Sequence, residues 1–225
     1  MTSTISESLH HRLNMYALAA SAAGVGTLAL AQPAEAKIVY THAHRVINPG
    51  GSFKLDLNHN GVPDFTLKNY TYCNTDQCFF KLVEEGAAGN SVVGVGRGSF
   101  QPLASALSRG ARIGRGGRFY GRTAILAYAY YGGGGSFASG KWVNVTNGYL
   151  GMRFQIKGKT HYGWARLSVK VSKTLVTSTL TGYAYETIPN KPIIAGKTRG
   201  PDVAVEPASL GRLAQGASGL SAWRK

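Results

Sequence analysis

The apolar residues of this chain come in short runs that alternate with polar residues and end at glycine or asparagine, and this pattern constrains the fold most. No long stretch between the two ends of the chain has the 3.6-residue period of an amphipathic helix. Residues 52–57, for example, place Phe53, Leu55 and Leu57 on one face of a strand. Such runs recur at intervals of about ten residues, which is typical of an antiparallel β-sandwich or a jelly roll.

We therefore predict a single all-β domain over residues 37–196, followed by a linker and tail over residues 197–225. Lys157, Gly158 and Lys159 predict a tight hairpin connection. Residues 86–122 are rich in glycine and arginine, so we expect a long loop there. Residues 70–83 hold aromatic and apolar side chains around the two cysteines. The expected strands are residues 38–40, 45–47, 52–57, 65–68, 124–131, 142–145, 149–156, 161–171 and 180–186.

Residues 1–36 have the three parts of a secretory signal peptide. A weakly basic start with Arg12 precedes an apolar run over residues 15–31, and Ala34-Glu35-Ala36 gives an A-x-A cleavage pattern. The run is short for a membrane anchor, which needs about 17–25 residues. We expect cleavage after Ala36 and a protein that is secreted or held in the cell envelope.

The charge of the chain is strongly basic, with 25 Lys and Arg against 10 Asp and Glu. No acidic residue lies between Glu85 and Glu186, whereas 13 Lys or Arg do. Such a balance favours polyanionic partners. Because an exported chain does not meet intracellular nucleic acid, we expect an anionic glycan, lipopolysaccharide or extracellular DNA.

Arginines recur at every third residue within the Gly/Arg-rich segment, and in extended backbone this period aligns side chains along one edge. We expect them to bind the polyanion, and the alternative is a solvated basic loop without a dedicated ligand. With the flanking arginines the set is Arg97, Arg109, Arg112, Arg115, Arg118 and Arg122.

Residues 56–64 have the spacing of a calcium loop, with side-chain or backbone oxygens at alternate positions and Gly61 permitting a sharp turn. The segment resembles the calcium loops of FG-GAP and dockerin-type modules. Two carboxylates predict weak binding, near the millimolar range of extracellular modules. The alternative is a turn that caps itself and binds nothing. The candidate Ca²⁺ ligands are Asp56, Asn58, Asn60, Val62 through its carbonyl, and Asp64.

The two cysteines, Cys73 and Cys78, enclose four residues. In an exported protein this spacing favours a disulfide that closes a small loop. The alternatives to a disulfide are two free thiols, or a metal site that the cysteines would share with His42 and His44.

Three segments of the second half, residues 162–167, 182–187 and 192–196, resemble the final strands of many bacterial exported proteins with a PEP-CTERM sorting signal. The tail is similar to a degenerate form of that signal, with Glu206-Pro207 and a basic end at Arg224-Lys225. The resemblance implies export and a β-rich build, and no particular reaction. Arg212 and Gln215 interrupt the apolar part of the tail, which argues against membrane anchoring.

The sequence contains no recognisable catalytic signature such as G-x-S-x-G or H-E-x-x-H. We therefore expect a non-enzymatic surface or matrix protein. The alternative is a carbohydrate-active hydrolase with a jelly-roll fold, which would need paired carboxylates in a cleft lined by Trp142, Trp164 or exposed tyrosines.

Overall fold

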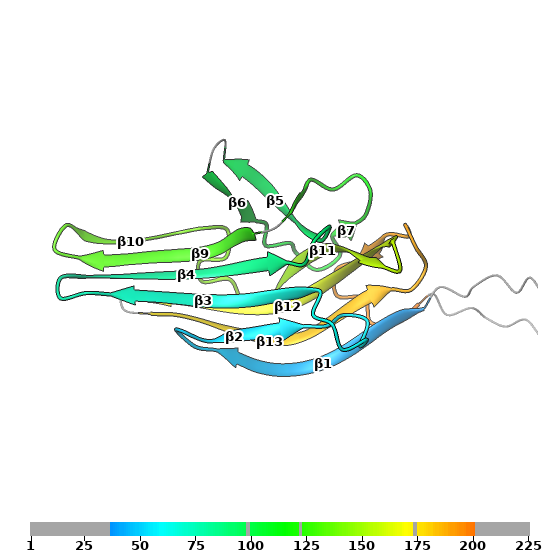
Figure 1. Ribbon diagram of the computed structural model, residues 1–225, viewed down its shortest axis with the longest axis horizontal. Coiled ribbons are helices and arrows are strands. Elements are labelled where there is room, and N and C mark those ends of the chain that lie inside the picture. Colours follow the sequence, from blue (N-terminus) through cyan, green and yellow to red (C-terminus); the bar gives the residue numbers. More distant parts are fainter. Residues whose placement is uncertain (1–36, 98–99, 122, 173–174, 201–225) are drawn as a thin grey trace, which may run out of the picture. The chain divides into compact units, whose positions relative to one another are not determined.

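A computed structural model describes residues 37–97, 100–121, 123–172 and 175–200 of the protein, and these form one all-β domain (Figure 1). The structure confirms the predicted fold class. Its strands are β1 (Ile38–Ile47), β2 (Ser52–Leu55), β3 (Phe65–Cys73), β4 (Gln77–Gly86), β5 (Ser91–Arg97), β6 (Phe100–Ala104), β7 (Arg112–Ile113), β8 (Phe119–Gly121), β9 (Thr123–Gly132), β10 (Gly135–Ser139), β11 (Gly148–Ile156), β12 (Lys159–Ser172), β13 (Leu175–Glu186) and β14 (Ile193–Ile194).

Twelve strands form one sheet that curls nearly into a barrel. Its order is β1-β13-β12-β11-β5-β6-β9-β4-β3-β2, with β10 on β9 and β8 on β5, and the β6–β9 pairing alone among these is parallel. The half that contains β12 and β13 packs face to face against the half that contains β4 and β9, and the two end strands, β1 and β2, approach each other (Figure 1). A sheet folded in this way encloses its core between two layers.

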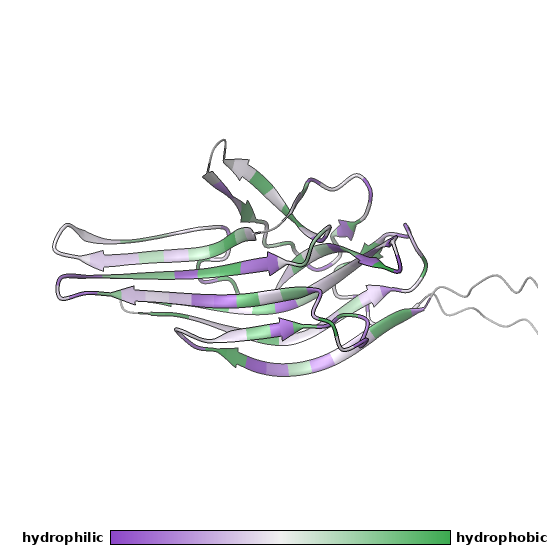
Figure 2. Cartoon of the chain, viewed as in Figure 1, coloured by the Kyte–Doolittle hydropathy of each residue, from purple (hydrophilic) through white to green (hydrophobic). Residues whose placement is uncertain are grey.

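The strands form where apolar and polar residues alternate, as the bands along the strands in Figure 2 show. In β3, for example, Phe65 and Leu67 point inward and are buried, and their neighbours are more exposed. The main core contains Trp142, Phe154 and Leu82 among its largest buried side chains. The fold therefore follows from burying one face of each strand.

The dense apolar run of β9 is explained by an irregularity in its pairing with β4. Leu82 pairs with Ala127 and Val83 with Ile125, so Leu126 is the extra residue of a β-bulge. Residues 124–127 are consequently all buried, although they are consecutive in a strand.

A second, smaller core lies on the outer face of β12 and β13, where the two-stranded β7–β14 sheet covers it. Trp164 packs there against Tyr149, with ring centroids 5.3 Å apart, and Ile193 of β14 is among its buried members. The indole nitrogen of Trp164 donates to the carbonyl of Lys197. The segment after β13 therefore folds back and completes the domain.

The Gly/Arg-rich segment of residues 86–122 is more regular than predicted. It contains β5, β6, β7 and β8, so the expected long loop is restricted to the residues between β6 and β8, which are interrupted by β7. The backbone of such small residues can still pair, and Gly94 lies so close to the backbone of Leu103 that a Cβ would not fit. Residues 142–145 are less regular than predicted, because they form a turn instead of a strand.

Candidate functional site

The four arginines of residues 109–118 are all exposed. Arg109 and Arg112 lie next to and on the β7–β14 sheet, Arg115 lies in the turn that follows, and Arg118 precedes β8, where its carbonyl accepts from the Gly94 amide of β5. Arg112 belongs to β7 and pairs with Ile194 of β14. Next to Arg109, the Gly110 amide donates to the carbonyl of Ala195 over 3.0 Å. Pairing with β14 therefore holds the middle of this segment against the domain, as a structured surface.

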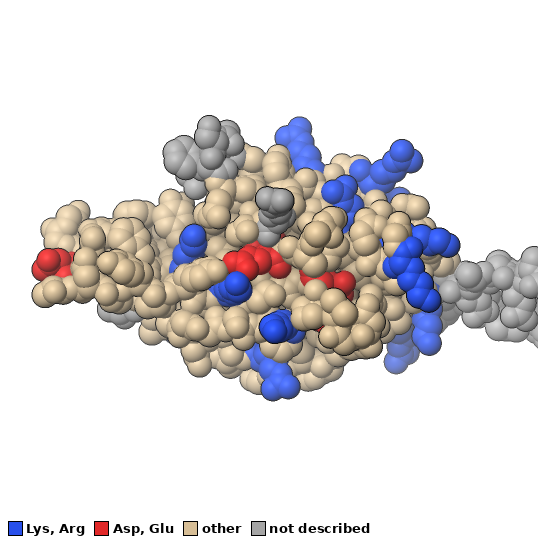
Figure 3. Space-filling view, viewed as in Figure 1, with Lys and Arg blue, Asp and Glu red and all other residues tan. Residues whose placement is uncertain are grey.

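None of these four arginines forms an ion pair with a described residue, because the ion pairs of the described chain are Lys68–Glu85 and Lys191–Glu186. Lys197 follows β14, and its amide donates to the carbonyl of Ile194. The preceding residue, Gly196, lies against the side chain of Arg109, so another exposed cation follows next to this arginine. We call Arg109, Arg112, Arg115, Arg118 and Lys197 the basic surface. On the face drawn in Figure 3, more of the Lys and Arg side chains lie in the right-hand half of the domain than in the left-hand half.

Of the remaining two predicted arginines, one lies on another hairpin and the other is not described by the structure. Arg97 is the last residue of β5 and pairs with Phe100, so it belongs to the β5–β6 hairpin. Arg122 lies outside the described residues.

The predicted calcium loop is folded by hydrogen bonds from its own backbone. The carboxylate of Asp56 accepts from the amides of Asn60 (3.2 Å) and Gly61 (2.7 Å). Asn58 Oδ1 accepts from the Asn60 amide, and Asn60 Oδ1 accepts from Val62. His59 and Gly61 have positive φ, which makes the sharp turn. This is the self-capped turn of the alternative hypothesis, although each oxygen keeps further lone pairs.

Asp64, the last predicted ligand, is buried and accepts a 2.8 Å hydrogen bond from the Leu57 amide. Burial raises its pKa to about 6, opposed by that hydrogen bond and assisted by nearby Asp56. Among the described residues, no group of three or more His, Cys, Asp or Glu side chains is arranged to hold a metal. Calcium binding by Asp56, Asn58, Asn60, Val62 and Asp64 stays a prediction.

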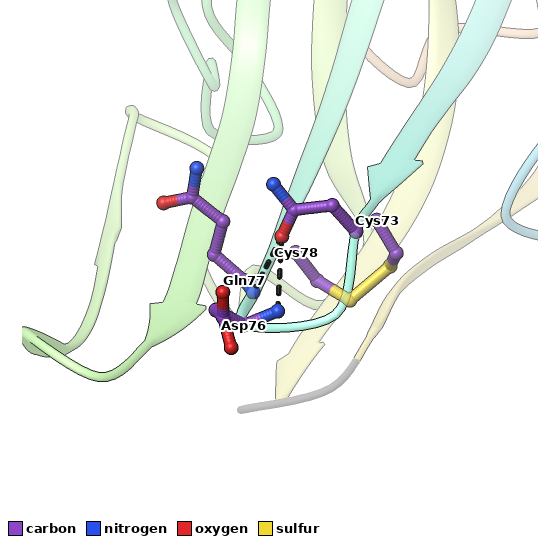
Figure 4. Close-up of a disulfide and its surroundings, with 5 residues drawn as sticks. Cys73, Asp76, Gln77 and Cys78 are labelled. Atoms are coloured by element: carbon purple, nitrogen blue, oxygen red, sulfur yellow. Dashed lines mark hydrogen bonds between the residues drawn. A yellow bond between two sulfur atoms is a disulfide. The ribbon is translucent and has the colours of Figure 1, made fainter.

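Cys73 and Cys78 form a disulfide at the tip of the β3–β4 hairpin, as predicted (Figure 4). They pair directly across the two strands, with their Cα atoms 4.1 Å apart. The Asn74 side chain accepts hydrogen bonds from the amides of Asp76 and Gln77 and closes the turn. The disulfide leaves no free cysteine in the chain.

The tryptophans that would line a hydrolase cleft are in the core instead, because Trp142 and Trp164 are both buried. Of two adjacent carboxyls on β4, Glu84 points inward and Glu85 outward. Desolvation raises the pKa of Glu84 to about 8, and Glu85, nearby, adds to the shift. Glu85 is held by Lys68, whose hydrogen bond lowers its pKa.

A row of aromatic side chains on the outer face of β3, β4, β9 and β10 was not predicted. Tyr72 pairs with Phe79, Phe79 with Tyr130, and Tyr130 with Phe137, so each of four strands that are adjacent in the sheet contributes one ring. We call these four residues the aromatic row. Each aromatic residue is visible in the sequence, and only the register between strands brings them together.

Comparison with models of known families, with curated proteins and with solved structures finds no match to this chain. No helix long and apolar enough to cross a membrane occurs among the described residues. The predicted signal peptide (residues 1–36) and the sorting-signal-like tail beyond residue 200 lie outside the described residues.

Proposed function

We propose that this protein is exported to the cell surface or extracellular matrix, and that it binds an anionic polymer through the basic surface. The observation that carries the proposal is that Arg109, Arg112, Arg115 and Arg118 are exposed and form no ion pair with a described residue. Arginine presents a planar fork of donors that suits carboxylate, sulfate and phosphate groups. An acidic glycan, lipopolysaccharide or extracellular DNA offers such groups in series.

Export is supported by the leader of residues 1–36 and by the disulfide, because disulfides persist in oxidising compartments. A weak calcium site in the 56–64 loop would fit the same environment, where calcium is abundant. The resemblance of the second half to PEP-CTERM proteins agrees with a surface location.

Binding is favoured over glycoside hydrolysis by the placement of the carboxyls. Hydrolysis uses two carboxyl groups that flank the sugar. Glu85 is accessible but engaged by Lys68 and Tyr70, whereas Glu84 lies on the other face of the strand. The two cannot act on one bond from these positions.

Retention on heparin resin and binding to a short DNA duplex, each measured over a range of salt concentrations, test the proposal. Changing Arg109, Arg112, Arg115 and Arg118 together to Gln should lower affinity for both probes. For the duplex, the slope of log K against log salt should become shallower by roughly 0.9 for each phosphate that the variant no longer neutralises.

A matched control changes four exposed cations on other elements, Arg45, Lys54, Lys141 and Lys170, to Gln. This variant has the same net charge as the first and should keep most of the affinity. Equal losses in both variants would show a general charge effect, and salt-insensitive or absent binding in the native protein would overturn the proposal.

A further inference from the structure

We propose that the outer face of β3, β4, β9 and β10 is a second binding site, distinct from the basic surface, that takes an uncharged polysaccharide. The site consists of the aromatic row and the groove beside it. It does not depend on the polyanion proposal, because it lies on other strands and uses other chemistry.

The aromatic row forms a continuous, largely exposed strip. The ring centroids of Phe79 and Tyr130 are 4.8 Å apart, and those of Tyr130 and Phe137 are 5.5 Å apart. Tyr72 is 64%, Phe79 44% and Phe137 53% exposed. Aromatic side chains seldom stay exposed in such contiguous groups unless they bind something.

A groove of about 560 Å³ runs beside Tyr72 and Phe79, within the size range of small-molecule sites. Tyr70 and Tyr128 line it together with the more polar Lys81, Glu85, Gln101 and Thr123. Apolar rings and hydrogen-bonding groups therefore meet along one surface.

The polar part of the groove is an ordered cluster. Tyr70 donates a 2.8 Å hydrogen bond to Glu85, and Lys68 pairs with the other oxygen of that carboxylate at 2.6 Å. Lys81 lies over the ring of Tyr70, 5.6 Å from its centroid. The rotamers of these groups are thus set before a ligand arrives, which lowers the entropy cost of binding.

Exposed aromatic rings beside an ordered polar cluster favour a ligand that has both apolar faces and hydroxyl groups. An apolar protein surface laid over the groove would remove water from Lys81 and Glu85 without replacing the hydrogen bonds to that water, which is unfavourable. A pyranose chain offers C–H faces to the rings and hydroxyls that donate to Glu85 and accept from Lys81. A carbohydrate therefore matches the whole surface.

The charge distribution favours an uncharged chain over an acidic one. Residues 69–80 and 123–140, which form this end of the domain, contain neither Lys nor Arg. The nearest cations on these strands, Lys68 and Lys81, are drawn to Glu85 and Tyr70. Among the described residues, no series of free cations follows the aromatic row.

Affinity electrophoresis of the protein in gels that contain hydroxyethylcellulose, xyloglucan, galactomannan or laminarin tests the proposal. We expect at least one of these neutral polymers to retard the native protein. Tyr72→Ala with Phe79→Ala should weaken this binding by roughly tenfold or more. Tyr72→Ala alone, at the most exposed ring, should give a smaller loss without disturbing the fold.

The matched control is Tyr131→Ala, since Tyr131 is 47% exposed but points to the opposite face of β9. It should bind normally, as should the variant without the four arginines of the basic surface. Moderate salt should not release the polymer, which separates this site from polyanion binding.

The proposal is overturned if none of the four polymers retards the protein, or if the Tyr72 and Phe79 substitutions leave retardation unchanged. It is also overturned if sedimentation velocity finds a dimer that Phe79→Ala abolishes, because the face would then serve a second copy of the chain.

Discussion

Glu84 and Glu85 are consecutive residues of β4, and their carboxyl groups lie on opposite faces of the sheet. Glu84 is 1% exposed, and its Oε1 has no hydrogen-bond partner among the described residues. Glu85 faces the groove and is paired with Lys68. Successive side chains of a strand point to opposite faces of the sheet, so these two glutamates contribute to stability with opposite dependence on pH.

Glu84 should make the protein less stable as the pH rises. Its pKa is about 8 in the folded protein and 4.5 when free, so the folded state retains a proton that the unfolded state releases. Stability from this group is complete below pH 4.5 and falls up to about pH 8. The unfolding free energy of the Glu84→Gln variant should equal that of the native protein near pH 4 and be higher by about 3 kcal/mol at pH 7. Urea unfolding at several pH values measures this.

Glu85→Gln provides the comparison with the opposite sign. The pKa of Glu85 is lowered by its hydrogen bond from Lys68, so its contribution to stability is present at neutral pH and lost as the pH falls. This variant should be less stable than the native protein at pH 7 and equal to it at low pH. Two variants with the same pH profile would contradict the assignment of the two faces.

Removing the disulfide should destabilise the domain without changing its fold. In the chain-entropy model, a loop of this length contributes about 2 kcal/mol, and Cys73→Ser with Cys78→Ser should lose that amount. Reductant should lower the melting temperature of the native protein and leave the variant unaffected. Alkylation of both cysteines without prior reduction, seen as a gain in intact mass, would show that the bond is absent.

Calcium should stabilise the protein through the 56–64 loop if the loop binds it. With a millimolar dissociation constant, about 10 mM calcium should add about 1.4 kcal/mol to the unfolding free energy. Asp56→Asn should abolish the effect, because it removes one of only two carboxylates. Equal stabilisation by magnesium, or none by calcium, would leave the self-capped turn as the whole role of the loop.

A methyl group at Gly163 should be poorly tolerated. A Cβ there would lie 2.7 Å from the carbonyl oxygen of Ala184 on the neighbouring strand, so the backbone would have to move. We expect Gly163→Ala to cost about 1–3 kcal/mol, measured by urea unfolding. Gly133→Ala, where the Cβ would meet nothing within 4 Å, should have little effect.

The local features of this fold could be predicted because they depend on neighbouring residues. The predicted tight hairpin connection is present between β11 and β12, where Lys157 and Gly158 form the turn and both have positive φ. The disulfide was predictable for the same reason, since Cys73 and Cys78 are close in sequence. The prediction of a strand at residues 142–145 was wrong. Trp142 is buried although it lies in a turn, and in a turn the alternation of apolar and polar residues does not indicate which side chains are buried.

Features that depend on register between distant strands could not be predicted. The aromatic row joins Tyr72 to Phe137 through two intervening strands, and a shift of one residue in any pairing would send a ring to the other face. The position of Lys197, directly after the Gly196 that contacts Arg109, likewise depends on the return of β14 to β7. The sequence identified the arginines but not their neighbours.

The pairing of β1 with β13 has a consequence for how the domain folds. Ile38 pairs with Glu186, and the Thr187 amide donates to the carbonyl of Lys37, so the first strand of the domain has its partner almost 150 residues later. Loop closure over such a distance is slow, and β1 is an unprotected edge until β13 arrives. A chain that crossed a membrane from its N-terminus would therefore remain open to chaperones and to aggregation until nearly the whole domain had emerged.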